Sequence, residues 1–195
     1  MKNRVTMKNI VRMDIRITLL GSFMWSLLTP YTSNLKGLLS TETLAVFMIL
    51  GSLSMETLMI LSKRTTLKTS FKYVIIYDII YLIILTSSWL LLDKKEFIFI
   101  VTAATVPYWP LIGNYENKLR AFIGEHYPRY FVEKVLTKTT MLDTRVGLIA
   151  MGVTALVSLV APDPGYIVPL FIFIAIIEIV YSIIVYNRYY YNFKG

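Results

Sequence analysis

Long runs of apolar residues alternate with shorter polar stretches along the whole chain. Six of these runs approach the roughly 20 residues that a helix needs to cross a membrane. They cover residues 17–35, 43–62, 73–92, 97–115, 146–161 and 166–187. No small-residue cleavage site follows the basic N-terminal segment, so we expect the first run to be a retained helix. The pattern predicts an all-α membrane protein, with six transmembrane helices in a single integral membrane domain.

The composition excludes several classes of protein. Hydrophobic residues make up 56% of the 195 residues and charged residues 16%, whereas soluble domains carry about a quarter charged residues. Disordered chains, coiled coils and ordinary soluble enzymes are therefore excluded. The chain has no Cys and only one His, His126, so disulfides, thiolate metal centres and His-rich metal sites are excluded as well. Because it has no glycine-rich phosphate loop and no nucleophile motif, we expect neither an enzyme nor a cofactor.

Basic residues gather in alternate connections between the apolar runs. They are concentrated in the N-terminal segment, after the second and fourth runs, and in the C-terminal tail, whereas the other connections contain only Lys36, Lys94 and Lys95. Connections rich in Lys and Arg stay in the cytoplasm. The sequence therefore predicts an inner-membrane protein with both termini cytoplasmic. This topology and attraction to anionic lipid account for the net charge of +8, so we expect no nucleic-acid partner.

Three acidic residues, Glu56, Asp78 and Glu178, lie inside the apolar runs. A charged group in hydrocarbon costs about 2.5–3.5 kcal/mol and normally faces the bundle interior or water. A rise of 1.5 Å per residue places Glu56 and Asp78 roughly 8–9 Å inside the cytoplasmic boundary. We therefore expect these two to share a cavity, with Ser52 and Tyr81 on the same helix faces. The acids would either exchange protons or bind a cation, or they would fix helix packing through hydrogen bonds.

The fourth run contains two prolines, Pro107 and Pro110, within the stretch 106–110. Each removes a backbone donor, which predicts a kinked helix. A broken helix can expose carbonyl groups to a substrate cavity, although prolines in membrane helices more often only bend the path. Residues 117–145 follow, with apolar positions at helical spacing that Pro128 interrupts. They predict a cytoplasmic amphipathic segment that lies at the membrane interface.

This layout resembles the N-terminal six-helix half of a major facilitator superfamily transporter. The shared features are a cytoplasmic N-terminus, a short basic loop after the second run, a proline-bearing fourth run and an amphipathic link into the fifth. Residues 61–68 lie where that family has the loop Gly-x-x-x-Asp-Arg-x-Gly-Arg-Arg. Arg64 matches the first Arg of this loop, but Lys63 stands where Asp is expected and the glycines are absent. The resemblance implies a half-size bundle, for which a homodimer or a second membrane protein would supply the other half.

Two functions from different classes fit these observations. In the first, the protein moves a small solute or drug across the membrane as a homodimer, with proton linkage through the three acids. In the second, it is a non-transporting membrane interaction protein, as in bacteriocin immunity or in plasmid or phage exclusion, and contacts an invading polypeptide within the bilayer. The buried acids favour the first function, and the degraded basic loop favours the second.

Overall fold

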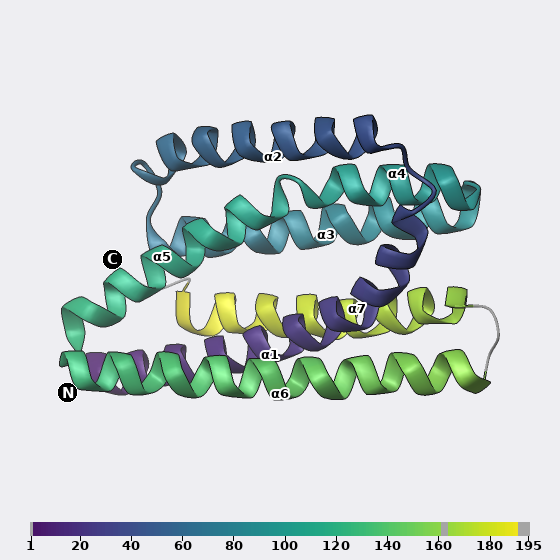
Figure 1. Ribbon diagram of the computed structural model, residues 1–195. Coiled ribbons are helices and arrows are strands. Elements are labelled where there is room, and N and C mark those ends of the chain that lie inside the picture. Colours follow the sequence, from purple (N-terminus) through teal and green to yellow (C-terminus); the bar gives the residue numbers. More distant parts are fainter. Residues whose placement is uncertain (1, 161–163, 191–195) are drawn as a thin grey trace. The chain divides into compact units, whose positions relative to one another are not determined.

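The computed structural model describes residues 2–160 and 164–190, apart from the side chains of residues 2–11, 13, 34, 35, 57–59, 61 and 164. Within these ranges every regular element is a helix (Figure 1), which confirms the all-α class. The α-helices are α1 (Lys2–Lys36), α2 (Thr41–Ser62), α3 (Leu67–Leu91), α4 (Lys94–Thr105), α5 (Tyr108–His126), α6 (Arg129–Val160) and α7 (Ile167–Val185). A 3₁₀ turn (Pro164–Tyr166) precedes α7, and a π-helical turn (Tyr186–Tyr190) follows it.

Four helical segments of the described chain are long and apolar enough to cross a membrane. They are α3, the combined segment Lys94–His126 formed by α4 and α5, α6, and the segment Ile167–Tyr190 formed by α7 and its π-helical turn. These segments hold the third to sixth predicted runs. Within the described residues, α1 and α2 do not meet the same criterion.

The predicted amphipathic segment 117–145 is not a separate element, which corrects the sequence interpretation. Its first part completes α5, and its second part begins α6, a single helix of 32 residues. The predicted interruption at Pro128 is present, because α5 ends at His126 and α6 starts at Arg129. α6 itself contains no proline, and it continues for about 48 Å. This length is well beyond the roughly 30 Å of a hydrocarbon core.

The chain folds into two compact units. The first comprises residues 1–31 and 128–194, and the second comprises residues 32–127. In the second unit, α3 packs against α4 and α5, and α2 packs against α5. Aromatic pairs join these helices, with ring centroids 5.2 Å apart for Phe47–Phe99, 5.0 Å for Phe71–Tyr115 and 5.5 Å for Trp89–Phe97.

In the first unit, α1 and α6 lie side by side and run in the same direction (Figure 1). The Ser22 hydroxyl donates a hydrogen bond to Asp143, and further along both helices Thr154 Oγ1 donates to the carbonyl oxygen of Leu27 at 3.3 Å. Because both contacts advance together, the two helices are parallel. The Trp25 ring on α1 also meets Phe171 of α7 edge-on, at 5.8 Å between centroids.

Candidate functional site

The helix of the fourth run is broken beside Pro107, in the second unit. Pro107 has no N–H group with which to continue the hydrogen-bond ladder. α4 ends at Thr105, the N–H of Val106 turns back to the carbonyl of Ala103 at 3.2 Å, and α5 begins at Tyr108. The predicted disturbance of the helix at Pro107 is confirmed. Pro110 does not add to it, because it lies in the first turn of α5, where N–H groups have no intrahelical partner.

A tyrosine from α3 satisfies a carbonyl group at this break. Where a helix ends, its last carbonyl oxygens need partners from outside the ladder. Tyr77 Oη donates a hydrogen bond to the carbonyl oxygen of Ala104 at 2.6 Å. The break is therefore held by a specific side chain of the neighbouring helix.

Three aromatic rings surround the start of α5. The ring of Tyr108 lies 6.1 Å from that of Tyr77 and 6.2 Å from that of Tyr81, centroid to centroid. Tyr81 and Tyr108 are buried. Since Tyr77 and Tyr81 are one turn apart on α3, both face the break. Of the predicted cavity residues, Tyr81 and Pro110 are buried and Pro107 is half-buried.

Asp78 follows Tyr77 on α3, the tyrosine that donates a hydrogen bond to the Ala104 carbonyl at the break. It is only 6% exposed and belongs to the packed face of α3, which also contains Phe71, Ile75 and Tyr81. Burying a charged carboxylate in a helix as apolar as α3 costs free energy. The structure therefore brings a buried carboxyl group, a broken helix and a tyrosine cluster into one part of the second unit.

A second polar cluster lies one to two turns further along α5, and the sequence interpretation missed it. Asn114 Nδ2 donates to Thr65 Oγ1 and to Ser70 Oγ, both at 3.2 Å. Among the described residues, the Oδ1 atom of Asn114 is buried without a hydrogen-bond partner. The sequence could have indicated it, because Asn114 lies in an apolar run and burying an amide side chain costs free energy unless it is hydrogen-bonded.

Glu56 does not lie where the sequence predicted. It and Ser52 are both exposed on α2, and the Ser52 hydroxyl donates to the carbonyl of Met48 in its own helix at 3.1 Å. The physical reason is that α2 packs on one side only, and Phe47 is its single buried residue among those described. The structure therefore does not bring together Glu56 and Asp78, which we expected to share a cavity: Glu56 is exposed, whereas Asp78 is buried.

Two acids of the first unit, Glu178 and Asp143, bear on the sequence predictions. Glu178 is 5% exposed and lies on the buried face of α7 with Phe171, Ala175 and Ser182. Asp143, predicted to lie in the cytoplasmic segment 117–145, accepts the hydrogen bond from Ser22. Because Ser22 lies inside the first apolar run, Asp143 lies beside that run. The parallel packing of α1 and α6 was the information that the sequence lacked.

In the described part of the chain, no group of three or more His, Cys, Asp or Glu side chains could hold a metal ion. The comparisons with known proteins add no further assignment, because no family model, curated protein or solved structure matches this chain.

Proposed function

We propose that this chain is an inner-membrane protein with six transmembrane helices, α1 and α2 included, and with both termini in the cytoplasm. The first unit supports this orientation. Because α6 runs parallel to α1 and α7 runs back (Figure 1), the starts of α1 and α6 and the end of α7 share one end of that unit. That end carries the basic residues Arg12, Arg16, Arg129, Lys134, Lys138 and Arg188.

The second unit supports the same orientation independently. The end of α2 and the start of α3 lie toward the end of this unit into which α5 runs (Figure 1), and basic residues gather on these segments: Lys63, Arg64, Lys68, Lys72, Lys118 and Arg120. The opposite end of this unit, where α4 begins, has Lys94 and Lys95 together with the acids Asp93 and Glu96. This asymmetry is the one that retains basic connections in the cytoplasm.

Within the membrane, the proposed activity is proton-linked movement of a small solute or drug. The observation that carries this proposal is the burial of Asp78 beside the broken α4–α5 segment. Protonation of Asp78 changes the charge on the turn of α3 that also holds Tyr77 against the Ala104 carbonyl. A change in that turn alters the packing of the break, and discontinuous helices of this kind line transport sites in known carriers.

The proposed working form is a homodimer, because the half-size facilitator layout supplies one bundle and alternating access needs two. Glu178, buried in the other unit, is a second proton-carrying candidate.

Transport is tested in proteoliposomes with ethidium, a cationic drug-like dye, under an imposed pH gradient. The proposal predicts gradient-driven ethidium movement with the wild-type chain and a loss of at least tenfold in Asp78→Asn, equivalent to about 1.4 kcal/mol. Glu56→Gln is the matched control and should retain wild-type movement, because Glu56 is exposed. Equal movement in all three samples would remove Asp78 from the mechanism.

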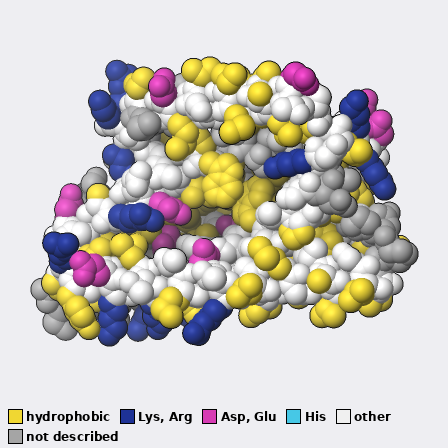
Figure 2. Space-filling model, in the orientation of Figure 1, with side chains coloured by type: hydrophobic (Ala, Val, Ile, Leu, Met, Phe, Trp, Pro, Cys, Tyr) yellow, Lys and Arg dark blue, Asp and Glu magenta, His cyan; other side chains and the backbone are white. Residues whose placement is uncertain are grey.

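One observation favours the alternative of a non-transporting interaction protein, of the immunity or exclusion kind. The exposed surface of α2 combines Glu56 with large apolar side chains, among them Met48, Ile49 and Leu53. Figure 2 shows hydrophobic side chains gathered along the middle of α2, with an acidic side chain toward each end. Such a surface suits contact with another polypeptide in the bilayer. In this alternative, cellular protection is lost in Glu56→Gln and persists in Asp78→Asn, the reverse of the order for transport.

A further inference from the structure

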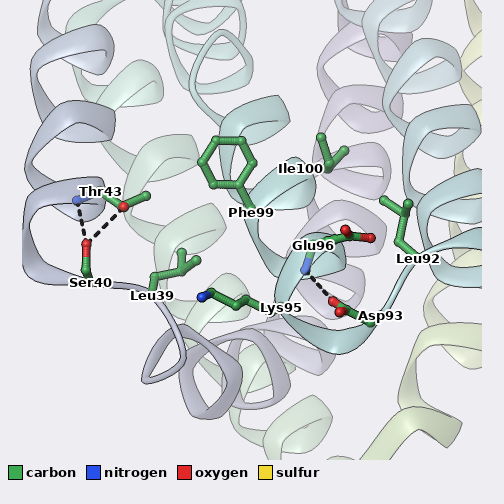
Figure 3. Close-up of a pocket in the computed structure, with 9 residues that line it drawn as sticks. All are labelled: Leu39, Ser40, Thr43, Leu92, Asp93, Lys95, Glu96, Phe99 and Ile100. Carbon is green, nitrogen blue, oxygen red and sulfur yellow. Dashed lines mark hydrogen bonds between the residues drawn. The ribbon is translucent and has the colours of Figure 1, made fainter.

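A cleft of about 660 Å³ opens in the second unit where α2 and α4 begin (Figure 3). Its volume lies in the range typical of small-ligand sites. The cleft is at the end of this unit opposite the basic connections, so in the proposed topology it lies at the outer boundary of the membrane. Its α4 residues lie in the first two turns of that helix, whereas the break at Pro107 follows the other end of α4.

The polar groups of the cleft fall into two sets. Two of them are already used in capping: Ser40 Oγ accepts from the N–H of Thr43 at 3.3 Å, and Asp93 Oδ1 accepts from the N–H of Glu96 at 2.8 Å. The ammonium of Lys95 and the carboxylate of Glu96 have no ion-pair partner among the described residues. These two charges are therefore available to a ligand.

Lys95 and Glu96 cannot neutralise each other. Consecutive residues on a helix project about 100° apart and do not face one another. In Figure 3 the Lys95 side chain extends toward Leu39 and Ser40, whereas the Glu96 carboxylate points the other way, above Asp93. The cleft thus has a positive side and a negative side, and a ligand that carries both charges can contact both.

The remaining wall is apolar. Leu39, Leu92, Phe99 and Ile100 line the cleft, and Phe99 and Ile100 lie one turn further into the spanning segment than Lys95 and Glu96. Phe99 is 44% exposed and Ile100 36% exposed. Charges at the mouth with an apolar wall running into the membrane match the structure of a phospholipid, in which the headgroup precedes the acyl chain.

We propose that this cleft binds a phospholipid with a primary ammonium headgroup, of the phosphatidylethanolamine class. The lipid phosphate contacts Lys95. The ammonium donates hydrogen bonds to the carboxylate of Glu96 and to Oδ2 of Asp93, the oxygen that does not cap α4. An acyl chain lies along Phe99 and Ile100. A choline headgroup has no N–H to donate, and a glycerol headgroup has no cation. Both therefore interact less favourably with the carboxylates of Glu96 and Asp93.

The test uses the full chain in detergent, incubated with an equal mixture of ethanolamine, choline and glycerol phospholipids that carry identical acyl chains. Retained lipid is measured by native mass spectrometry. The wild-type protein should retain the ethanolamine lipid preferentially. Lys95→Ala should lower its retention roughly fivefold, the effect of one basic residue near a membrane surface. Glu96→Gln should abolish the preference for ethanolamine over choline.

Lys94→Ala and Glu125→Gln are matched controls, because each removes the same charge as one variant without lining the cleft. Both should retain the ethanolamine lipid like the wild type. Equal retention of the three lipids by the wild-type protein, or an equal loss in the controls, would overturn the proposal. Soluble glycerophosphoethanolamine, added at the same concentration as the lipid, should not displace it, since it lacks acyl chains. Displacement would overturn the assignment to a lipid.

Discussion

At the scale of single residues, the hydroxyl of Tyr77 joins α3 to the end of α4. It donates to the Ala104 carbonyl at 2.6 Å, and its ring lies 6.1 Å from that of Tyr108. A carbonyl without a partner in an apolar region costs free energy. This one hydrogen bond therefore stabilises a break that would otherwise leave a backbone acceptor unsatisfied.

Tyr77→Phe should lower the free energy of unfolding by about 1 kcal/mol, because it removes the hydroxyl and keeps the ring. Unfolding in mixed detergent, followed by circular dichroism, measures this change. Tyr73→Phe is the control, since Tyr73 is exposed one turn earlier on α3. An equal effect of both substitutions would show that the bond to Ala104 contributes nothing specific.

The same scale shows which site residues the sequence could identify. Asp78 and Glu178 were identifiable because an acid in an apolar run is costly, and both lie on buried faces. Glu56 also lies in an apolar run, but it is exposed. Its burial depends on which helices pack against α2, and the pattern of apolar residues does not specify that packing. The sequence did not indicate the contact of Asp143 with Ser22, because the two residues lie far apart in the chain and only helix packing brings them together.

At the scale of helices, the prolines of the fourth run have different effects despite their closeness. Pro107 sits between α4 and α5, whereas Pro110 lies in the first turn of α5. The sequence predicted a disturbed helix and could not tell which proline causes it. The continuous α6 was likewise hidden, because a change from polar to apolar residues looks like an element boundary although the backbone has none there.

Pro107→Ala should restore a backbone donor and extend the helix through the break, leaving stability unchanged or raised. Ethidium movement should nevertheless fall at least tenfold, because the proposed mechanism needs the break. Pro110→Ala should change neither property. The two properties are measured by detergent unfolding and by the proteoliposome assay, and full transport in Pro107→Ala would contradict the role given to the break.

The packing of α1 against α6 leads to a second prediction at this scale. A Cβ atom at Gly147 would lie 3.2 Å from Ser26 Oγ, whereas one at Gly152 on the same helix would meet nothing within 4 Å. Gly147→Leu should therefore destabilise the protein by about 1–3 kcal/mol, and Gly152→Leu should not. Detergent unfolding of the two variants compares them directly, and Ser26→Ala should recover part of the loss in Gly147→Leu. Equal stability of the two leucine variants would show that α1 and α6 do not approach closely at Gly147.

At the scale of the whole molecule, the proposed topology places the basic ends of both units in the cytoplasm. Because the chain has no Cys, single cysteines report membrane sidedness without background. A cysteine at Glu125 should react with an impermeant maleimide only after the cells are opened, whereas one at Gly37 should react in intact cells. Reaction of both in intact cells would contradict the topology.

The central claim is that the charge on Asp78 controls the packing of the broken helix. Gly113 on α5 provides the most direct test, because a Cβ atom there would meet nothing within 4 Å and a cysteine should fit. The rate of maleimide labelling at Gly113→Cys in nanodiscs, divided by that at the control Gly51→Cys on α2 to remove the pH dependence of the thiol, should change with pH. Adding Asp78→Asn should make this ratio independent of pH. A ratio that varies with pH equally with and without Asp78 would contradict the account.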